Sequence, residues 1–516
     1  MVAANNRRSA AALFLLSSYL VALLALVKGL LFIPLYLRHF DVATYGSYLA
    51  SANVVGILGV LDVGITTAFY QRLAFAHGGG HRDEFARLTG AGLVVLGITA
   101  LFIGGIGWSI STFVPGWIGA PSKSSMALAQ TFRLTVLGSA AMILNQGILG
   151  VPAAWQLPFV SAASRLGAQV IEMVVVVICL FSGWGLVSLG WGSLVGGLLS
   201  LMVTLVSVLR QWRKRHLPVP RPDRASFSWL LSVGIPTLLS RVMGQIAGNI
   251  EVVLVSAIMG PSVAAVYGIT ERTFRLVQTF INPIVGSVFS GLAHLMGERG
   301  SNALLSPLRE LRGIYTLVVS VLVPSILVIN QDFVTLWVGH DQFGGTLLST
   351  ALALSTVLST QVFFLSFVCS AAGQVRETAY LAALEAAIRV PLIVAGLHFL
   401  GPAGMALSTS LGCGILALVA YPVLVGRGLS LDRATARAAG NEGLQTTLVC
   451  IFLGAAGARW LPTTAHWLTL AAKGTLMSLV FLGTTLLLSS AARSQLVIIP
   501  AKLTKRFGPD DRLIRK

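Results

Sequence analysis

Charge is scarce in this sequence. Only 10% of its 516 residues are Asp, Glu, Lys or Arg, whereas soluble domains carry roughly 25% charged residues. Hydrophobic residues make up 55% of the chain, and the mean hydropathy is +0.83. Apolar runs near the length of a membrane-spanning helix recur along the whole chain, and they are too continuous for barrel strands. The composition therefore predicts an all-α polytopic membrane protein.

Acidic residues are half as common as basic ones, 18 against 36, so the net charge is +18. In a soluble protein this excess would suggest nucleic acid, but basic residues collect in the cytoplasmic loops of membrane proteins. We therefore expect no nucleic-acid partner. Cysteine is also rare, with four residues in apolar runs and no CxxC pair. This usage indicates small buried hydrophobes and excludes a disulfide framework.

Several functional motifs are missing. The sequence has no P-loop, and Gly78-Gly79-Gly80 lacks the lysine that such a loop requires. His77 and His81 flank these glycines, but no third ligand lies nearby, so we expect neither a metal site nor a cofactor. The first apolar run has no signal-peptidase exit and is expected to stay as a helix. No predicted external loop is long enough to form a catalytic domain.

Turn chemistry divides the apolar sequence into about fourteen spans. Gly183-Trp184-Gly185, Gly260-Pro261 and Gly401-Pro402 are examples of the breaks. The predicted spans are 11–37, 45–70, 88–112, 126–150, 157–182, 186–210, 227–257, 260–292, 309–330, 346–371, 376–400, 403–426, 442–460 and 468–490.

The longest hydrophilic link is the basic segment 211–226. It separates an N-terminal six-helix bundle (1–210) from a C-terminal one (227–426). Two additional helices (427–490) and a basic tail (491–516) follow. With both termini in the cytoplasm, basic residues crowd the cytoplasmic side, and only Arg38, Lys123 and Arg459 lie outside. The distribution of Lys and Arg therefore predicts this orientation.

The two halves share a pattern. Tyr45-Gly46 opens the second span and Tyr267-Gly268 opens the eighth, and the turns at Gly183 and Gly401 are offset by a similar distance. With six spans in each half, the repeats have the same orientation in the membrane. Parallel repeats are a transporter architecture in which the site lies between the halves.

Ionisable residues occur inside the predicted spans, although each costs roughly 2.5–3.5 kcal/mol to insert. Helical spacing places Ser161, Arg165, Gln169 and Glu172 in one stripe. It places Tyr267, Glu271, Arg275, Gln278 and Asn282 in another. Such stripes favour a water-filled cavity, and the alternative is that the charges join helices by pairing. Lys473, near one end of the last span, is expected to reach toward the interface.

Basic groups slightly outnumber acidic ones inside the spans, which favours a phosphate-bearing substrate because Arg offers forked donors. The candidate substrate-cavity residues are Lys28, Arg133, Arg165, Arg241, Arg272 and Arg275. The candidates for ion coupling are Asp62, Glu251 and Glu271, although Glu271 is equally a static partner for an arginine. The expected structural charge pairs involve Glu172, Glu385 and Arg389.

Short motifs carry a family resemblance. Ile33-Pro34 ends a helix, Tyr45-Gly46 opens the next, Leu61-Asp62-Val63-Gly64 follows late in the second span, and Gly404-Met405-Ala406 comes after Gly401-Pro402. This pattern resembles the Wzx-type polysaccharide-unit flippases of the multidrug/oligosaccharidyl-lipid/polysaccharide (MOP) exporter superfamily.

The resemblance implies a V-shaped, MATE-like core of twelve helices plus two, which works by alternating access. It also implies an undecaprenyl-pyrophosphate-linked oligosaccharide as substrate, location in the bacterial inner membrane and coupling to an ion gradient. Membrane lipids and a polysaccharide polymerase or export complex are the expected partners. The alternatives are a cation-coupled drug antiporter of the same fold, an enzyme of polysaccharide assembly and a non-transporting scaffold.

Overall fold

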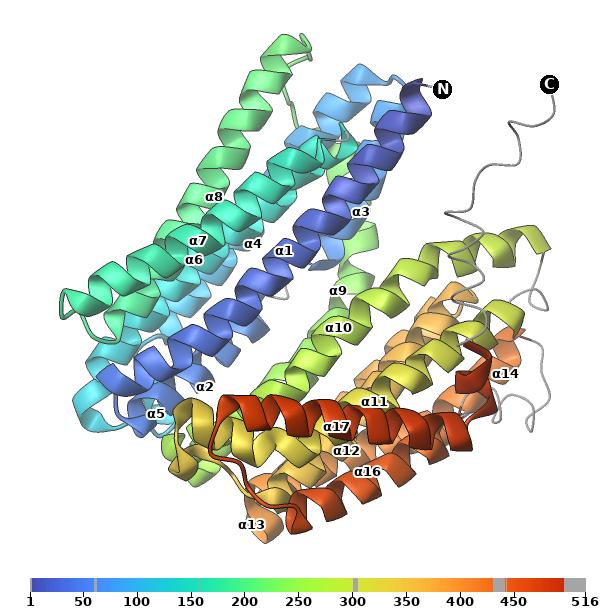
Figure 1. Ribbon diagram of the computed structural model, residues 1–516. Coiled ribbons are helices and arrows are strands. Elements are labelled where there is room, and N and C mark those ends of the chain that lie inside the picture. The colour runs from blue at the N-terminus through green and yellow to red at the C-terminus, as the bar shows by residue number, and fades with distance from the viewer. Residues whose placement is uncertain are drawn as a thin grey trace. The chain divides into compact units, whose positions relative to one another are not determined.

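The computed structural model describes residues 2–59, 63–155, 157–299, 305–429, 441 and 443–495. Across these residues the chain is helical and contains no strand, as the composition predicts. It forms two compact units, Met1–Gly268 and Ile269–Lys516 (Figure 1). The predicted domain division at segment 211–226 stays a prediction.

The first unit is built from nine helices and the start of a tenth within the described residues. They are α1 (Val2–His39), α2 (Val42–Leu58), α3 (Val63–Gly78), α4 (Arg82–Ile110), α5 (Val114–Trp117), α6 (Ser122–Ala154), α7 (Pro158–Phe181), α8 (Val187–Lys214) and α9 (Arg224–Met259), followed by α10 (Pro261–Arg299), which continues into the second unit.

The second unit takes up the rest of α10. Its other elements are α11 (Leu305–Val338), the 3₁₀ turn η3 (His340–Gln342), α12 (Thr346–Ala371), α13 (Val375–Ile415), the π-helical turn η4 (Leu416–Ala420), α14 (Tyr421–Leu429), α16 (Leu444–Trp460) and α17 (Trp467–Leu488).

The predicted glycine breaks lie at real turns. Gly183 and Gly185 have positive φ between α7 and α8, and Gly260 has φ 95° at the end of α9. Gly401 (φ 61°) interrupts α13 between its two halves. Only glycine adopts these angles without strain, so the residue type determines where the helices end.

Three details differ from the predicted spans. Pro34 lies inside α1, which continues to His39, so the expectation that a helix ends at Ile33-Pro34 is wrong. The predicted span 45–70 falls on two helices, α2 and α3. Spans 376–400 and 403–426 fall largely on the single, interrupted α13, with η4 and α14. Eight helices among the described residues are long and apolar enough to cross a membrane, and the count of fourteen stays a prediction.

Large apolar side chains are exposed along these helices. Leu101 on α4, Phe399 on α13 and Phe452 on α16 are 78%, 85% and 75% exposed. In water such surfaces would be unfavourable, whereas lipid chains cover them without cost. The exposed apolar side chains therefore agree with a multi-pass membrane protein.

Small residues bring helices together in the first unit. A Cβ atom on Gly197 of α8 would lie 2.4 Å from the carbonyl oxygen of Gly138 on α6, so the two backbones touch. Glycine is required at position 46, in the first of the two repeated Tyr-Gly pairs. A side chain there would overlap the carbonyl of Pro261 at the start of α10. Close backbone approach of this kind is a common way to pack helices in membranes.

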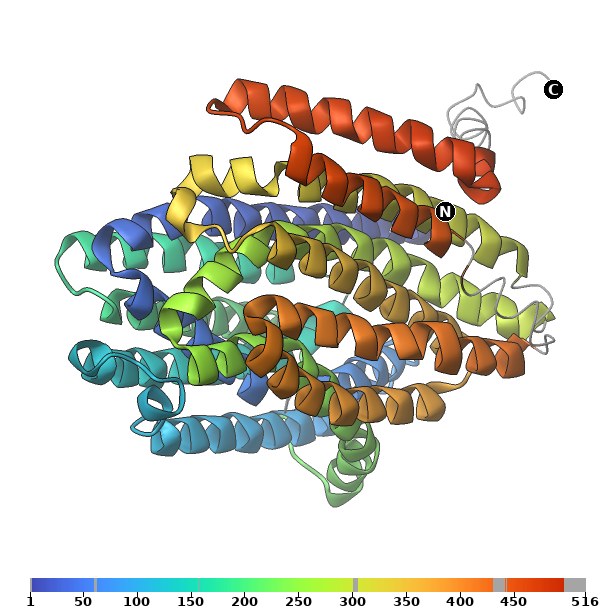
Figure 2. The ribbon, with the colours of Figure 1, turned by 90° about the horizontal axis from the view of Figure 1, so that it is seen from below.

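Other helices extend the core of each unit. In the first unit, α9 packs against α2, α3 and α4. In the second, α11 contacts α12, α16 and α17, and α12 packs along α13. The last two helices, α16 and α17, lie side by side in both ribbon views (Figures 1 and 2).

Candidate functional site

A cavity of about 360 Å³ lies among α1, α6, α7 and α8 in the first unit. Its polar lining comes mainly from α7, where Arg165, Gln169 and Glu172 share one face. Three of the four residues in the predicted stripe therefore line the cavity. The fourth, Ser161, is buried and does not line it. The other lining residues are Val21, Met142, Gln146, Ala168, Ser193, Gly196 and Gly197. We call it the α7 cavity.

A buried hydrogen-bond network next to the α7 cavity fixes its walls. The Asn145 amide on α6 donates to Ser164 Oγ on α7 (3.1 Å) and to Ser200 Oγ on α8 (2.7 Å). Thr204 of α8 donates to Ser164 Oγ at 2.9 Å. Asn145 and Ser164 directly precede Gln146 and Arg165 in the sequence, so the network sets the position of these two lining residues.

Arg165 has donor capacity that the protein does not use. Its Nη2 donates to Gln146 Oε1 at 3.2 Å, but its buried Nε has no hydrogen-bond partner. The buried Oε1 of Gln169, one helical turn away, also has none. Buried polar atoms are almost always hydrogen-bonded in proteins. The α7 cavity therefore offers one cationic donor and one neutral acceptor to a bound molecule.

Lys28 of α1 joins this site through a salt bridge. Its Nζ lies 2.6 Å from Glu172 Oε1, and the two side chains are 29% and 26% exposed. The pair connects a predicted substrate residue with a predicted structural one. Because Lys28 neutralises Glu172, the charge of Arg165 is left uncompensated in the lining of the α7 cavity.

Two other candidates of the first unit lie elsewhere. Arg133 donates from Nε to Ser111 Oγ (2.7 Å), and its guanidinium lies 5.1 Å from the ring centre of Trp108. Glu251 is 6% exposed and accepts a hydrogen bond of 3.0 Å from the Tyr267 hydroxyl. Asp62 and the side chain of Arg241 lie outside the described residues.

Four candidates of the second unit form two helix-internal pairs. Arg275 Nε lies 2.8 Å from Glu271 Oε1, and Arg272 is half-buried on the same helix. Arg389 Nη1 lies 3.4 Å from Glu385 Oε1, and its Nε donates to Thr409 Oγ1. Both pairs are of the kind that the pairing alternative describes, and the roles of these residues stay predictions. The predicted cleft between the two halves stays a prediction.

Two buried charges in the second unit were not recognised from the sequence. Arg312 falls at the start of the predicted span 309–330 and was not among the candidates, but it is 1% exposed and donates to Gln361 Oε1 at 2.6 Å. Asp332 lies just beyond the same span, is 2% exposed, and its Oδ2 accepts from Lys473 Nζ at 2.8 Å. The expectation that Lys473 reaches toward the interface stays a prediction. Their partners lie on other helices, so the helical spacing within one span gives no signal for them.

Comparison with known proteins agrees with this architecture. A family model described as "Polysaccharide biosynthesis protein" matches residues 10–290. No curated protein sequence matches the chain.

Among solved structures, an inward-facing MATE family multidrug resistance transporter of the MOP superfamily is similar, with TM-score 0.66. It is 16% identical over 79% of this chain and 93% of its own.

The lipid II flippase MurJ, in an inward closed conformation, also has TM-score 0.66. It is 15% identical and covers 91% of this chain and 97% of its own. The Vibrio cholerae MATE transporter VcmN in its bent form has TM-score 0.55 at 14% identity, over 85% and 99% of the two chains. At these identities the likeness shows the fold alone. The family match, in contrast, covers more than half of the chain. The chain belongs to the polysaccharide biosynthesis protein family, as the resemblance of its motifs predicted.

Proposed function

We propose that this protein is a flippase that moves undecaprenyl-pyrophosphate-linked oligosaccharide units across the bacterial inner membrane by alternating access, without converting them chemically. The units would serve the assembly of a surface polysaccharide. The family match supports a role in polysaccharide biosynthesis, and the fold is one that transporters use.

The observation that carries the proposal is the unpartnered donor of Arg165 in the α7 cavity. A guanidinium that lines a cavity binds phosphate oxygens through charge-assisted hydrogen bonds. Gln169 Oε1, also unpartnered, can accept from a sugar hydroxyl. An organic cation would be repelled by the net positive lining, so the cavity favours the flippase over the drug antiporter.

Replacing Arg165 tests this assignment. In liposomes loaded with the lipid-linked oligosaccharide, Arg165→Ala should lower the apparent affinity for substrate about ten- to a hundredfold, because a hydrogen bond to a charged group contributes about 1.5–3 kcal/mol. Arg165→Lys should recover only part of it, since lysine lacks the forked donors. The matched control is Arg210→Ala, which removes an exposed arginine of α8.

Normal flipping by Arg165→Ala would overturn the assignment. A melting curve of each purified variant separates loss of binding from loss of the fold.

Ion coupling is part of the proposal and concerns Glu251. Its carboxylate is buried and accepts a hydrogen bond from the Tyr267 hydroxyl. In such a setting a carboxyl group can exchange its proton when its surroundings change. Glu251→Gln should make flipping insensitive to an imposed proton or sodium gradient. A variant that still responds to the gradient as the natural protein does would assign Glu251 a structural role.

A further inference from the structure

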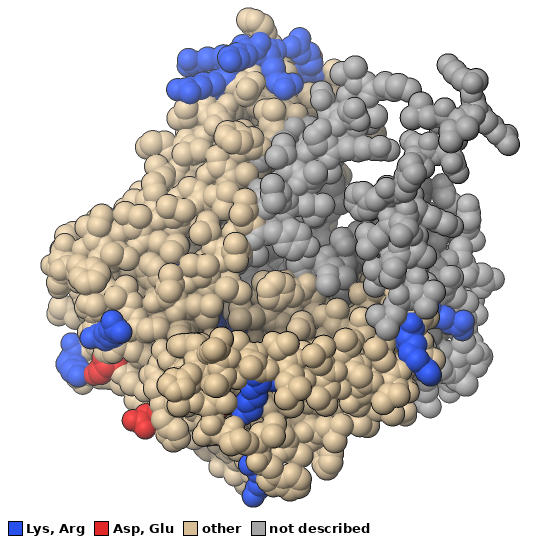
Figure 3. Space-filling model, in the orientation of Figure 1, with Lys and Arg blue, Asp and Glu red and all other residues tan. Residues whose placement is uncertain are grey.

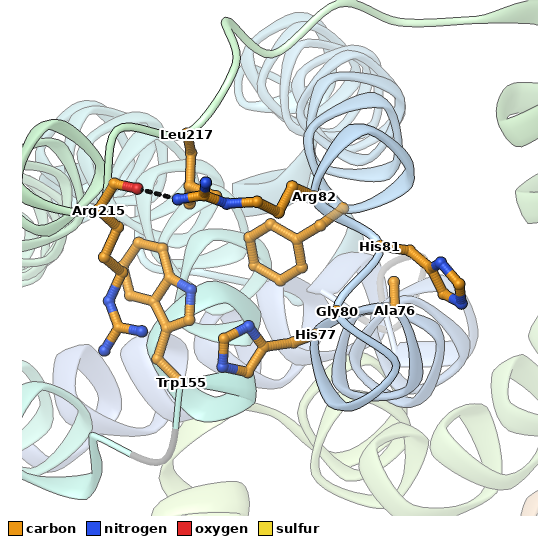
Figure 4. A pocket seen from close by; sticks show the side chains of 9 residues that line it. Ala76, His77, Gly80, His81, Arg82, Trp155, Arg215 and Leu217 are labelled. Carbon is orange, nitrogen blue, oxygen red and sulfur yellow. Dashed lines mark hydrogen bonds between the residues drawn. The ribbon is translucent and has the colours of Figure 1, made fainter.

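A second cavity, of about 340 Å³, lies at one end of the first unit. It forms where α3 ends, α4 begins, α6 ends and α8 leads into segment 211–226. It shares no residue with the α7 cavity. The lining residues are Ala76, His77, Gly80, His81, Arg82, Phe85, Trp155, Arg215 and Leu217, shown in Figure 4. We call it the Arg82/Arg215 cavity.

The lining of this cavity is cationic, and among the described residues that form it there is no carboxylate. Arg82 extends across the cavity and donates to the backbone carbonyl of Arg215, which places two guanidinium groups on its walls (Figure 4). The first turn of α4 carries two acidic residues, Asp83 and Glu84, but neither lines the cavity, and Glu84 is paired with Arg72 at 2.7 Å. Nothing acidic in the described lining therefore neutralises the two arginines.

Two buried donors beside the cavity have no acceptor. They are Arg215 Nε and the indole Nε1 of Trp155, a residue that is 5% exposed. Leaving a buried donor unpaired costs about 1–3 kcal/mol, and two such donors from different helices at one cavity are unusual. A ligand that supplies acceptor oxygens would satisfy both.

The backbone next to Arg215 is held in a rare conformation. His216 has φ 48°, and it is the one residue other than glycine with positive φ among the described residues. Such strain persists only where the surroundings fix it, and it collects at ligand sites. The indole of Trp212 donates to the Pro218 carbonyl at 3.0 Å and ties down the chain after the turn.

Aromatic side chains support the arginines rather than offering a surface for stacking. The Arg215 guanidinium lies 5.0 Å from the ring centre of Trp155. Trp155 in turn stacks on Phe85, with ring centres 6.1 Å apart. Phe85 is 1% exposed, so these ring faces are already covered. A nucleotide base would find no free platform, whereas a small anion needs none.

The pKa of His77 reflects its burial beside a cationic group. Burial, and then the neighbouring Arg215, lower the pKa of His77 below its ordinary value. The cavity therefore disfavours one more positive charge. Figure 4 shows the ring of His77 on the side of Trp155, while that of His81 lies beyond Gly80.

We propose that the Arg82/Arg215 cavity binds a phosphate group, as a monophosphate or diphosphate anion. Such a group is available from the head of an anionic lipid or from a soluble phosphate. Exposed basic residues surround this end of α8, among them Arg210, Arg213 and Lys214, and Figure 3 shows Lys and Arg gathered there. They would attract an anion by long-range electrostatics. The site is separate from the proposed transport cavity and does not depend on it.

The test uses the purified full chain in an uncharged detergent, with inorganic diphosphate as the probe. Calorimetric titration should show saturable binding, and diphosphate should raise the melting temperature because it binds only the folded state. Trp155→Phe keeps the aromatic packing and removes one orphan donor, so the affinity should fall severalfold. Arg82→Gln should lower it about tenfold or more.

Arg213→Gln is the matched control. It removes one exposed charge from α8 two residues before Arg215, and the affinity should change less than twofold. Equal losses in Arg213→Gln and Arg82→Gln would show binding to the general basic surface and overturn the proposal. Absence of saturable binding to the natural protein would overturn it as well.

The two sources of phosphate are distinguished in nanodiscs. If phosphatidylglycerol prevents diphosphate binding and phosphatidylcholine does not, the occupant is a lipid head group. If diphosphate binds equally in both, the occupant is a soluble phosphate. Trp155→Phe should weaken either interaction.

Discussion

Asp41, in the turn between α1 and α2, contacts two groups at once. Its Oδ1 accepts from the Thr44 backbone N–H at 2.9 Å, which caps α2, and its Oδ2 lies 2.6 Å from Lys123 Nζ. The Lys123 ammonium, with help from Thr44, lowers the pKa of Asp41 from 3.8 to about 2. The carboxylate therefore stabilises the fold above pH about 4, and this contribution is lost as the pH falls toward 2.

Asp41→Asn should lower the melting temperature modestly at pH 6, because the pair is partly exposed and such pairs contribute about 1 kcal/mol or less. The difference from the natural protein should shrink as the pH approaches 2. A difference that stays constant between pH 6 and pH 2 would show that the charge is not responsible.

Lys28 and Glu172 allow a second test at the scale of single residues. If substrate phosphate replaces Glu172 as the partner of Lys28, then Lys28→Ala should weaken substrate binding. Glu172→Gln should strengthen it, since the lysine loses its competing carboxylate. The measurement is the substrate concentration for half-maximal flipping. Similar losses in both variants would mean that the pair only joins α1 to α7.

At the scale of helices, Asp332 and Lys473 connect α11 to α17. Asp332 is buried (2% exposed) and Lys473 is largely buried (13% exposed), and the lysine also donates to the Pro462 carbonyl at 3.0 Å. Removing one member of a buried pair leaves an uncompensated charge and costs about 3 kcal/mol or more. Asp332→Leu and Lys473→Leu should therefore each destabilise the protein, while the double variant should lose much less than the sum. Additive losses in denaturant unfolding would contradict this coupling.

The polar and charged residues of the helices show which contacts the sequence can predict. Helical spacing correctly placed Arg165, Gln169 and Glu172 on one face of α7, because that requires only the geometry of one helix. It could not show that Glu172 meets Lys28, which is 144 positions away. Asp332 falls just beyond its predicted span and Arg312 at the start of that span, and neither was considered as a buried charge. Partners on different helices depend on packing, which one sequence does not reveal.

At the scale of the molecule, the glycine turns and the all-helical fold followed from local chemistry. The extent of the compact units depends on packing between helices. Apolar packing of α9 on α2 and α3 carries the first unit past segment 211–226 to Gly268. The basic segment is recognisable by composition alone, whereas the choice of packing neighbours depends on surfaces that form only after folding.

Orientation in the membrane is the remaining property of the whole molecule that the basic residues predict. In a Cys179→Ser background the three other cysteines are buried, so single introduced cysteines report their own side. Ala225→Cys, exposed at the start of α9, should react with a membrane-impermeant maleimide only after the cells are opened. Thr463→Cys, exposed between α16 and α17, should react in intact spheroplasts, because the positive-inside rule places it outside. The reverse pattern would mean that the chain has the opposite orientation. Labelling of both positions from the same side would mean that the predicted number of membrane crossings between them is wrong.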